Sequence, residues 1–126
     1  MKRTERGWAG HFCCSYRCKW HRNTLIEHEG KYLIVSSVGE MLKGFKVQEF
    51  EEIGLNRYYE TMVFVGVQKG PYIDCDVSKQ RDFDGEWQIC EYPELGIDLK
   101  AEENHENAVK YVMDHFDEVY EGEDIF

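Results

Sequence analysis

The residues best equipped for chemistry stand near the N-terminus, where basic side chains alternate with aromatic rings. Aromatic side chains recur at every fourth position from Trp8 to Trp20, so an unbroken strand would place them on one face. Arg17 and the side chains at 19 and 21 would occupy the other face. Guanidinium groups grip phosphate and aromatic rings stack on bases, so this pattern predicts a site for a nucleotide-like ligand. From the pattern alone, an aromatic core strand with a solvated basic outer face is the commoner explanation.

A second set of such residues lies at positions 56–61. In a strand, alternation would place Arg57 and Tyr59 on one face and Glu60 on the other, among core side chains. An inward-facing carboxylate needs a cationic partner, because an unpaired buried charge is very costly. An arginine such as Arg22 could supply that partner. Such a pair is either purely structural or positions a ligand.

These two segments together define a predicted ligand-binding site, with no catalytic residue, metal ligand or cofactor assigned. The arginines would hold phosphate, the rings at 8, 20 or 59 would stack on a base, and Glu60 would orient an arginine or accept from a ribose hydroxyl. The predicted site residues are Trp8, His11, Arg17, Trp20, Arg22, Asn23, Arg57, Tyr59 and Glu60.

Two further patterns carry a metal-binding alternative. Asp74 and Asp76 share one side of a strand and could hold Mg²⁺ or Mn²⁺, although such a pair is more often the solvated face of an edge strand. Cys14, Cys18 and His21 have a spacing that a zinc site could use, but paired knuckles are missing. We expect the five cysteines to be small buried residues without disulfides, because their number is odd and the compartment is reducing.

The 126-residue chain has a net charge of −10 that is unevenly spread. Residues 1–24 hold six basic side chains against one acid, whereas residues 98–126 hold ten acids and two lysines. The overall acidity argues against general nucleic-acid binding, and the contrast between the ends favours contacts between copies in a homo-oligomer. With no membrane-length apolar run and no secretory signal, a cytoplasmic location is expected.

The sequence pattern predicts a single α+β domain over 1–126 that positions these residues. Residues 1–99 should be mainly β, residues 100–121 should form a helix, and residues 122–126 form an acidic tail. We expect an antiparallel β-sheet built from hairpins, with one amphipathic C-terminal helix packed on it. The helix shows an apolar stripe at helical spacing. Its members are Ala108, Val109, Val112, Met113, Phe116, Val119 and Tyr120. The expected strands are 11–18, the hairpins 23–28/31–38 and 57–67/72–77, and short strands near 47–53 and 87–91.

Up to about Val77 the chain resembles a group of small proteins encoded by phages, prophages and mobile elements. The resemblance lies in the strings ERGWAGHFCCSYRCKWHRNTLIE, VSSVG, IGLNRYYETMVF and DCDVS. Those proteins tend to have Phe at position 20 and Arg at position 21, so His21 departs from them, and this weakens the zinc interpretation. The resemblance implies a phage origin and the cytoplasm of a bacterial host.

In outline the chain is also similar to phage proteins that sequester nucleotide immune signals, such as the Thoeris anti-defence proteins. This analogy implies a phage-encoded, non-enzymatic oligomer that captures an anionic nucleotide-like host signal. A small metal-dependent hydrolase or nuclease using His11, Glu60, Asp74 and Asp76 is one alternative. The other is an acidic decoy that binds a host defence protein through the helix at 101–121.

Overall fold

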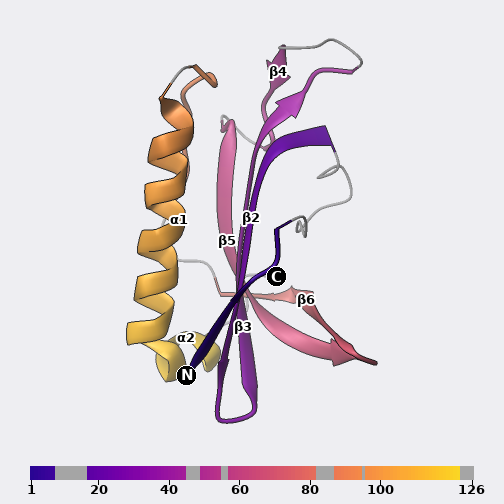
Figure 1. The fold of residues 1–126 in the computed structure, drawn as a ribbon, viewed down its shortest axis with the longest axis vertical. Coiled ribbons are helices and arrows are strands. Elements are labelled where there is room, and N and C mark those ends of the chain that lie inside the picture. The colour runs from indigo at the N-terminus through magenta and orange to yellow at the C-terminus, as the bar shows by residue number, and fades with distance from the viewer. Residues whose placement is uncertain (8–16, 45–48, 55–56, 82–86, 95, 123–126) are drawn as a thin grey trace.

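A six-stranded antiparallel sheet with a C-terminal helix along one face makes up the fold, so the predicted α+β class is confirmed (Figure 1). This computed structural model describes residues 1–7, 17–44, 49–54, 57–81, 87–94 and 96–122. The strand order is β1-β2-β3-β5-β6, and β4 pairs with β3 beside that path. The elements are β1 (Lys2–Glu5), β2 (Cys18–His28), β3 (Lys31–Leu42), β4 (Phe50–Glu51), β5 (Tyr59–Lys69), β6 (Tyr72–Gln80), α1 (Ile97–Asp114) and α2 (Phe116–Tyr120).

Both predicted hairpins form; β2, β3 and β6 are longer than expected, and β5 has the expected length but is shifted by two residues. The β2–β3 turn consists of Glu29 and Gly30, whose φ values of 51° and 76° are both left-handed, as a tight two-residue hairpin turn of type I′ requires. Gly70 and Pro71 join β5 to β6, and Gly70 has a φ of 63°. Turn chemistry in the sequence is therefore enough to locate these two reversals of the chain.

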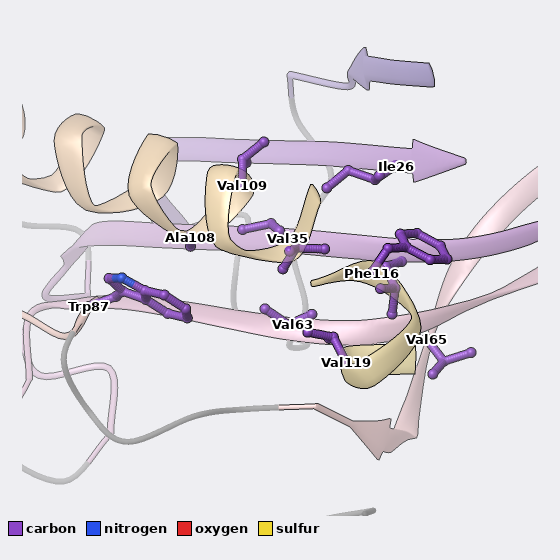
Figure 2. Packing of buried hydrophobic residues seen from close by; sticks show 11 residues of the cluster. Ile26, Val35, Val63, Val65, Trp87, Ala108, Val109, Phe116 and Val119 are labelled. Carbon is purple, nitrogen blue, oxygen red and sulfur yellow. The ribbon is translucent and has the colours of Figure 1, made fainter. Parts of the chain in front are cut away.

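The main hydrophobic core lies between the sheet and the two helices. Figure 2 shows side chains of β2, β3 and β5, among them Ile26, Val35 and Val63, gathered beneath the helices. The apolar stripe predicted from helical spacing faces this core: five of its members are buried, and Met113 and Tyr120 pack at its margin. The buried cluster consists of Ile26, Leu33, Val35, Val63, Val65, Trp87, Ala108, Val109, Val112, Phe116 and Val119.

The single helix predicted over 100–121 is wrong in its limits and continuity. It starts earlier, at Ile97, after Gly96 in a left-handed conformation, and it breaks at His115, whose φ and ψ of −128° and 36° leave the helical region. After the break, α2 carries Phe116 into the core, where its ring meets His28 edge to face. No glycine or proline marks this break, so the local sequence carries no signal for it.

Several strands also differ from expectation. β1 was not predicted, yet Lys2–Glu5 pairs antiparallel with β2, placing Glu5 opposite Thr24. The strand expected at 11–18 lies almost entirely outside the described residues, and β2 begins at Cys18. The short strand expected at 87–91 is reduced to an isolated bridge between Ile89 and Tyr59, whereas β4 does fall within 47–53.

Arg6 links the two outer edges of the sheet. Its backbone continues β1 by bonding Asn23, its Nε donates to Asn23 Oδ1 at 2.9 Å, and its guanidinium also donates to the carbonyl of Ile73 in β6. The same guanidinium lies over the Tyr72 ring, 5.4 Å from its centroid. The sheet is therefore curled, and its edges approach each other on the face opposite α1.

Phe116→Ala should destabilise the fold by about 3–5 kcal/mol, because it removes the large side chain that anchors α2 in the core. Leu99→Ala, at an α1 position that is 70% exposed, is the control and should change stability by less than about 0.5 kcal/mol. Urea unfolding followed by circular dichroism measures both. Equal effects of the two substitutions would contradict the assigned docking of α2.

Candidate functional site

Strand alternation divides the predicted site residues between the two faces of the sheet. Trp20 and Tyr59 pack against the start of α1, and Arg22 faces the same helix. Asn23 and Glu60 follow Arg22 and Tyr59 directly in β2 and β5, so their side chains lie on the opposite face. The predicted residues therefore do not converge on one pocket. Trp8 and His11 lie outside the described residues.

Two of the arginines assigned to phosphate are held by carboxylates elsewhere. Arg57 forms an ion pair with Glu60, with Nη1 and Oε2 3.4 Å apart. The expectation that Arg22 would be the partner of Glu60 is wrong, because the sheet separates the two. Arg17 donates to Glu51 at 2.6 Å, which ties the start of β2 to β4.

Arg22 instead belongs to a charged cluster that joins β1, β2 and α1. Its guanidinium pairs with Glu102 and, at 2.8 Å, with Glu106; Glu5 Oε2 lies 3.2 Å away. Arg3 donates to Glu106 at 2.7 Å, and this hydrogen bond is the main cause that lowers the pKa of Glu106 to about 2. Two arginines of the basic N-terminal segment and two carboxylates of the acidic helix thus pair within one chain.

A buried histidine that the sequence analysis missed lies beneath this cluster. His105 is fully buried and bonds Thr24 through Nε2 at 2.8 Å and Ser37 through Nδ1 at 2.6 Å. Thr24 donates to Glu5 at 2.7 Å, because a carboxylate only accepts. The network therefore assigns the proton to Nε2, which donates to Thr24, and Ser37 donates to Nδ1. Ser37 can then accept from Thr61 at 2.7 Å, which completes the chain.

The position of His105 in the helix was the signal that could have found it. It falls in register with the apolar stripe, four residues after Ala101 and three before Ala108, and both of those are buried. A histidine on an apolar helix face must satisfy two ring nitrogens inside the protein. Hydroxyl side chains on the facing strands could supply these two hydrogen bonds.

A pocket of about 560 Å³ opens where the end of the sheet meets the N-terminus of α1. Its volume is within the range of small-molecule binding sites. In Figure 1 the orange, N-terminal end of α1 and β4 lie at this same end of the molecule. The pocket is lined by Lys19, Glu40, Phe50, Tyr59, Pro93, Glu94 and Asp98.

Tyr59 is the best fixed of these lining residues. Its ring lies directly on the backbone of Gly39, so closely that a Cβ there would come within 2.2 Å of the ring. Trp20 meets it edge to face, with centroids 5.6 Å apart. Its hydroxyl donates to Glu40 at 2.8 Å, and burial together with this carboxylate raises the pKa of Tyr59. The missing side chain at Gly39 is what lets the aromatic ring pack against the backbone of β3 beside the pocket.

The chemistry of the pocket is that of hydrogen-bond acceptors beside aromatic surface. Of the described lining residues, Glu40, Glu94 and Asp98 are acidic and Lys19 is the one cation. The Lys19 ammonium lies 5.9 Å from the centroid of the Phe50 ring. The pocket can therefore stack a planar group on Phe50, accept hydrogen bonds from several donors and contact one anionic group.

The described residues that were considered as metal ligands make other contacts in the structure. Among the described residues, no group of three His, Cys, Asp or Glu side chains is placed to hold a metal ion. His21 bonds the carbonyl of Cys18 through Nε2 at 2.7 Å, and Cys14 lies outside the described residues. Asp74 pairs with Lys69 on the outer side of β6. Asp76 in turn accepts from the Ser78 hydroxyl.

Searches of protein-family models, curated proteins and solved structures find no match to this chain. The helices in the described part of the chain include none long and apolar enough to cross a membrane.

Stability should fall as the pH drops from about 6.5 to 4, because burial, with a contribution from Arg22, lowers the pKa of His105 to about 4. The unfolded chain keeps an ordinary histidine pKa and binds the proton first, so this stabilisation is present above pH 6.5 and lost on acidification. The loss is about 3 kcal/mol at 1.36 kcal/mol per unit. Urea unfolding at several pH values measures it.

His105→Gln removes the titrating ring and should abolish this part of the pH dependence. His115→Gln, which changes a histidine at the helix break, should retain it. The same slope in wild type and His105→Gln between pH 6.5 and 4 would contradict the assignment.

Gly39→Ala should destabilise the protein by about 1–3 kcal/mol and disturb the pocket, because the new methyl group overlaps the Tyr59 ring. In a Tyr59→Leu background, where the ring is absent, the same substitution should lower the free energy of unfolding much less. Thermal and urea unfolding of the four proteins in this double-mutant cycle measure the coupling. Additive effects would show that the ring does not depend on Gly39.

Proposed function

We propose that this protein is a non-enzymatic binding protein that holds a nucleoside-like small molecule in the pocket between the end of the sheet and α1. The observation that carries the proposal is the combination of the partly exposed Phe50 ring with three carboxylates and Lys19 around about 560 Å³. Planar heterocycles stack on aromatic rings, and ribose hydroxyls and ring amines donate to carboxylates. Each part of a nucleoside thus has a complementary group.

The arginines are no longer the basis for phosphate binding. Arg17, Arg22 and Arg57 each pair with a carboxylate, so a phosphate would have to displace that partner. Lys19 is the cation that we assign to a phosphate, at the rim of an otherwise acidic pocket. The charge balance favours a ligand with one phosphate group over a polyphosphate, because each added negative charge is repelled by the carboxylates.

The resemblance to phage-encoded proteins supplies the biological setting of the proposal. The ligand is a nucleotide-like host immune signal in the cytoplasm of a bacterial host, and binding without turnover lowers its free concentration. The charge contrast that favoured association between copies is used within one chain, where Arg3 and Arg22 contact Glu106. Association into a homo-oligomer therefore stays a prediction without that support.

Isothermal titration calorimetry with nucleosides and nucleoside monophosphates tests the proposal. Phe50→Ala should weaken binding about tenfold through loss of stacking. Lys19→Ala should weaken the binding of a nucleoside monophosphate but leave the affinity for the parent nucleoside unchanged. Lys100→Ala is the matched control, because this exposed lysine pairs with Glu91 and does not line the pocket.

Two further results complete the test. The bound compound should be recovered intact after the protein is denatured, whereas release of a product that a chelator suppresses would favour the metal-dependent hydrolase. A protein that is folded by circular dichroism yet binds none of these compounds would contradict the proposed function.

A further inference from the structure

We infer that the preferred ligand carries a guanine-type base, read by the carboxylate of Glu40. This inference rests on the proposed function and adds the identity of the base and the residue that selects it. It depends on one property that separates Glu40 from the other acids of the pocket, namely a fixed orientation.

Glu40 is the half-buried carboxylate of the pocket, whereas Glu94 and Asp98 are exposed. Its Oε2 accepts a hydrogen bond of 2.8 Å from the Tyr59 hydroxyl, and the Tyr59 ring is itself held against Gly39. The orientation of this side chain is therefore set by its neighbours before any ligand arrives. A pre-organised carboxylate loses little conformational entropy when it binds a ligand. It can therefore discriminate between bases better than an exposed carboxylate that has to be ordered on binding.

The backbone at Glu40 is held in an uncommon conformation as well. Its φ of 55° lies in the left-handed region, which costs energy for a residue with a Cβ. Lys19 and Glu40 stand opposite each other where β2 and β3 approach their ends, between the paired residues Trp20–Gly39 and Cys18–Met41. The surrounding pairing thus maintains a strained residue at the pocket, where its side chain lines the wall.

The donor pattern of the bases decides which one fits. An ionised carboxylate only accepts, and its two oxygens accept from two donors side by side. Guanine presents such a pair, the ring N1–H and the adjacent 2-amino group. Adenine and cytosine present an amine next to a ring acceptor, and uracil presents one N–H between two carbonyls. Oε2 has a second lone pair, so the bond from Tyr59 does not prevent it from accepting from the base.

Titrations of the full chain with the 5′-monophosphates of guanosine, inosine, adenosine and uridine test the inference. Inosine differs from guanosine by the missing 2-amino group alone. Wild-type protein should bind guanosine monophosphate at least about tenfold more tightly than inosine monophosphate, as expected for one hydrogen bond to a charged group. The other two nucleotides should bind more weakly still.

Glu40→Gln replaces one acceptor by a donor and should reduce the guanosine-to-inosine preference to within about twofold. Tyr59→Phe keeps the ring but removes the hydroxyl that positions Glu40. It should weaken guanosine monophosphate, which donates to Glu40 twice, more than inosine monophosphate, which donates once, and so lower the preference. Glu103→Gln, an exposed α1 acid that does not line the pocket, should behave as wild type. Thermal unfolding shows that each variant is folded.

The outcomes separate the two proposals. If none of the nucleotides binds to folded protein, the proposed function itself is overturned. If they bind but guanosine and inosine monophosphates do so equally, the guanine inference is overturned and the proposed function stands. A guanosine preference that Glu40→Gln leaves intact would overturn the role of Glu40.

Discussion

The docking of α1 onto the sheet is the interaction on which the rest of this structure depends. It buries the apolar stripe of the helix against β2, β3 and β5, and it brings the acidic side chains of the helix over the basic residues of β1 and β2. The same docking places the start of the helix beside Tyr59 and Trp20, which creates one wall of the pocket. Core, charge pairing and candidate site are thus consequences of one contact.

Polar groups give that contact its precise position. Apolar packing is not directional, so it alone would tolerate small shifts of the helix along the sheet. The hydrogen bonds of His105 to Thr24 and Ser37 are directional and fully buried, and a shift would leave them unsatisfied at considerable cost. The helix is therefore fixed in register as well as in face, and the pocket at its N-terminus has a defined shape.

The fold changes how the charge of the protein should be interpreted, because it determines which charged side chains are paired. Arg3 and Arg22 face α1 and pair there with its acidic side chains, whereas Arg17 pairs with Glu51 of β4. What remains unbalanced is acidic, including the outer side of α1 and the wall of the pocket. For this reason the site that we propose recognises mainly the base and the ribose of its ligand, whereas the sequence pattern pointed to the phosphate.

The sequence by itself determined the features that depend on local periodicity and turn chemistry. The hairpin turn at Glu29 and Gly30 and the apolar stripe of the helix follow from spacing and from backbone preference alone. Only the tertiary structure decided which distant groups meet. Arg22 meets Glu102 and Glu106 of α1 instead of Glu60, and His105 finds its hydroxyl partners more than 60 residues away. Such pairs depend on strand order and helix register, which long-range packing sets and no short stretch of chain encodes.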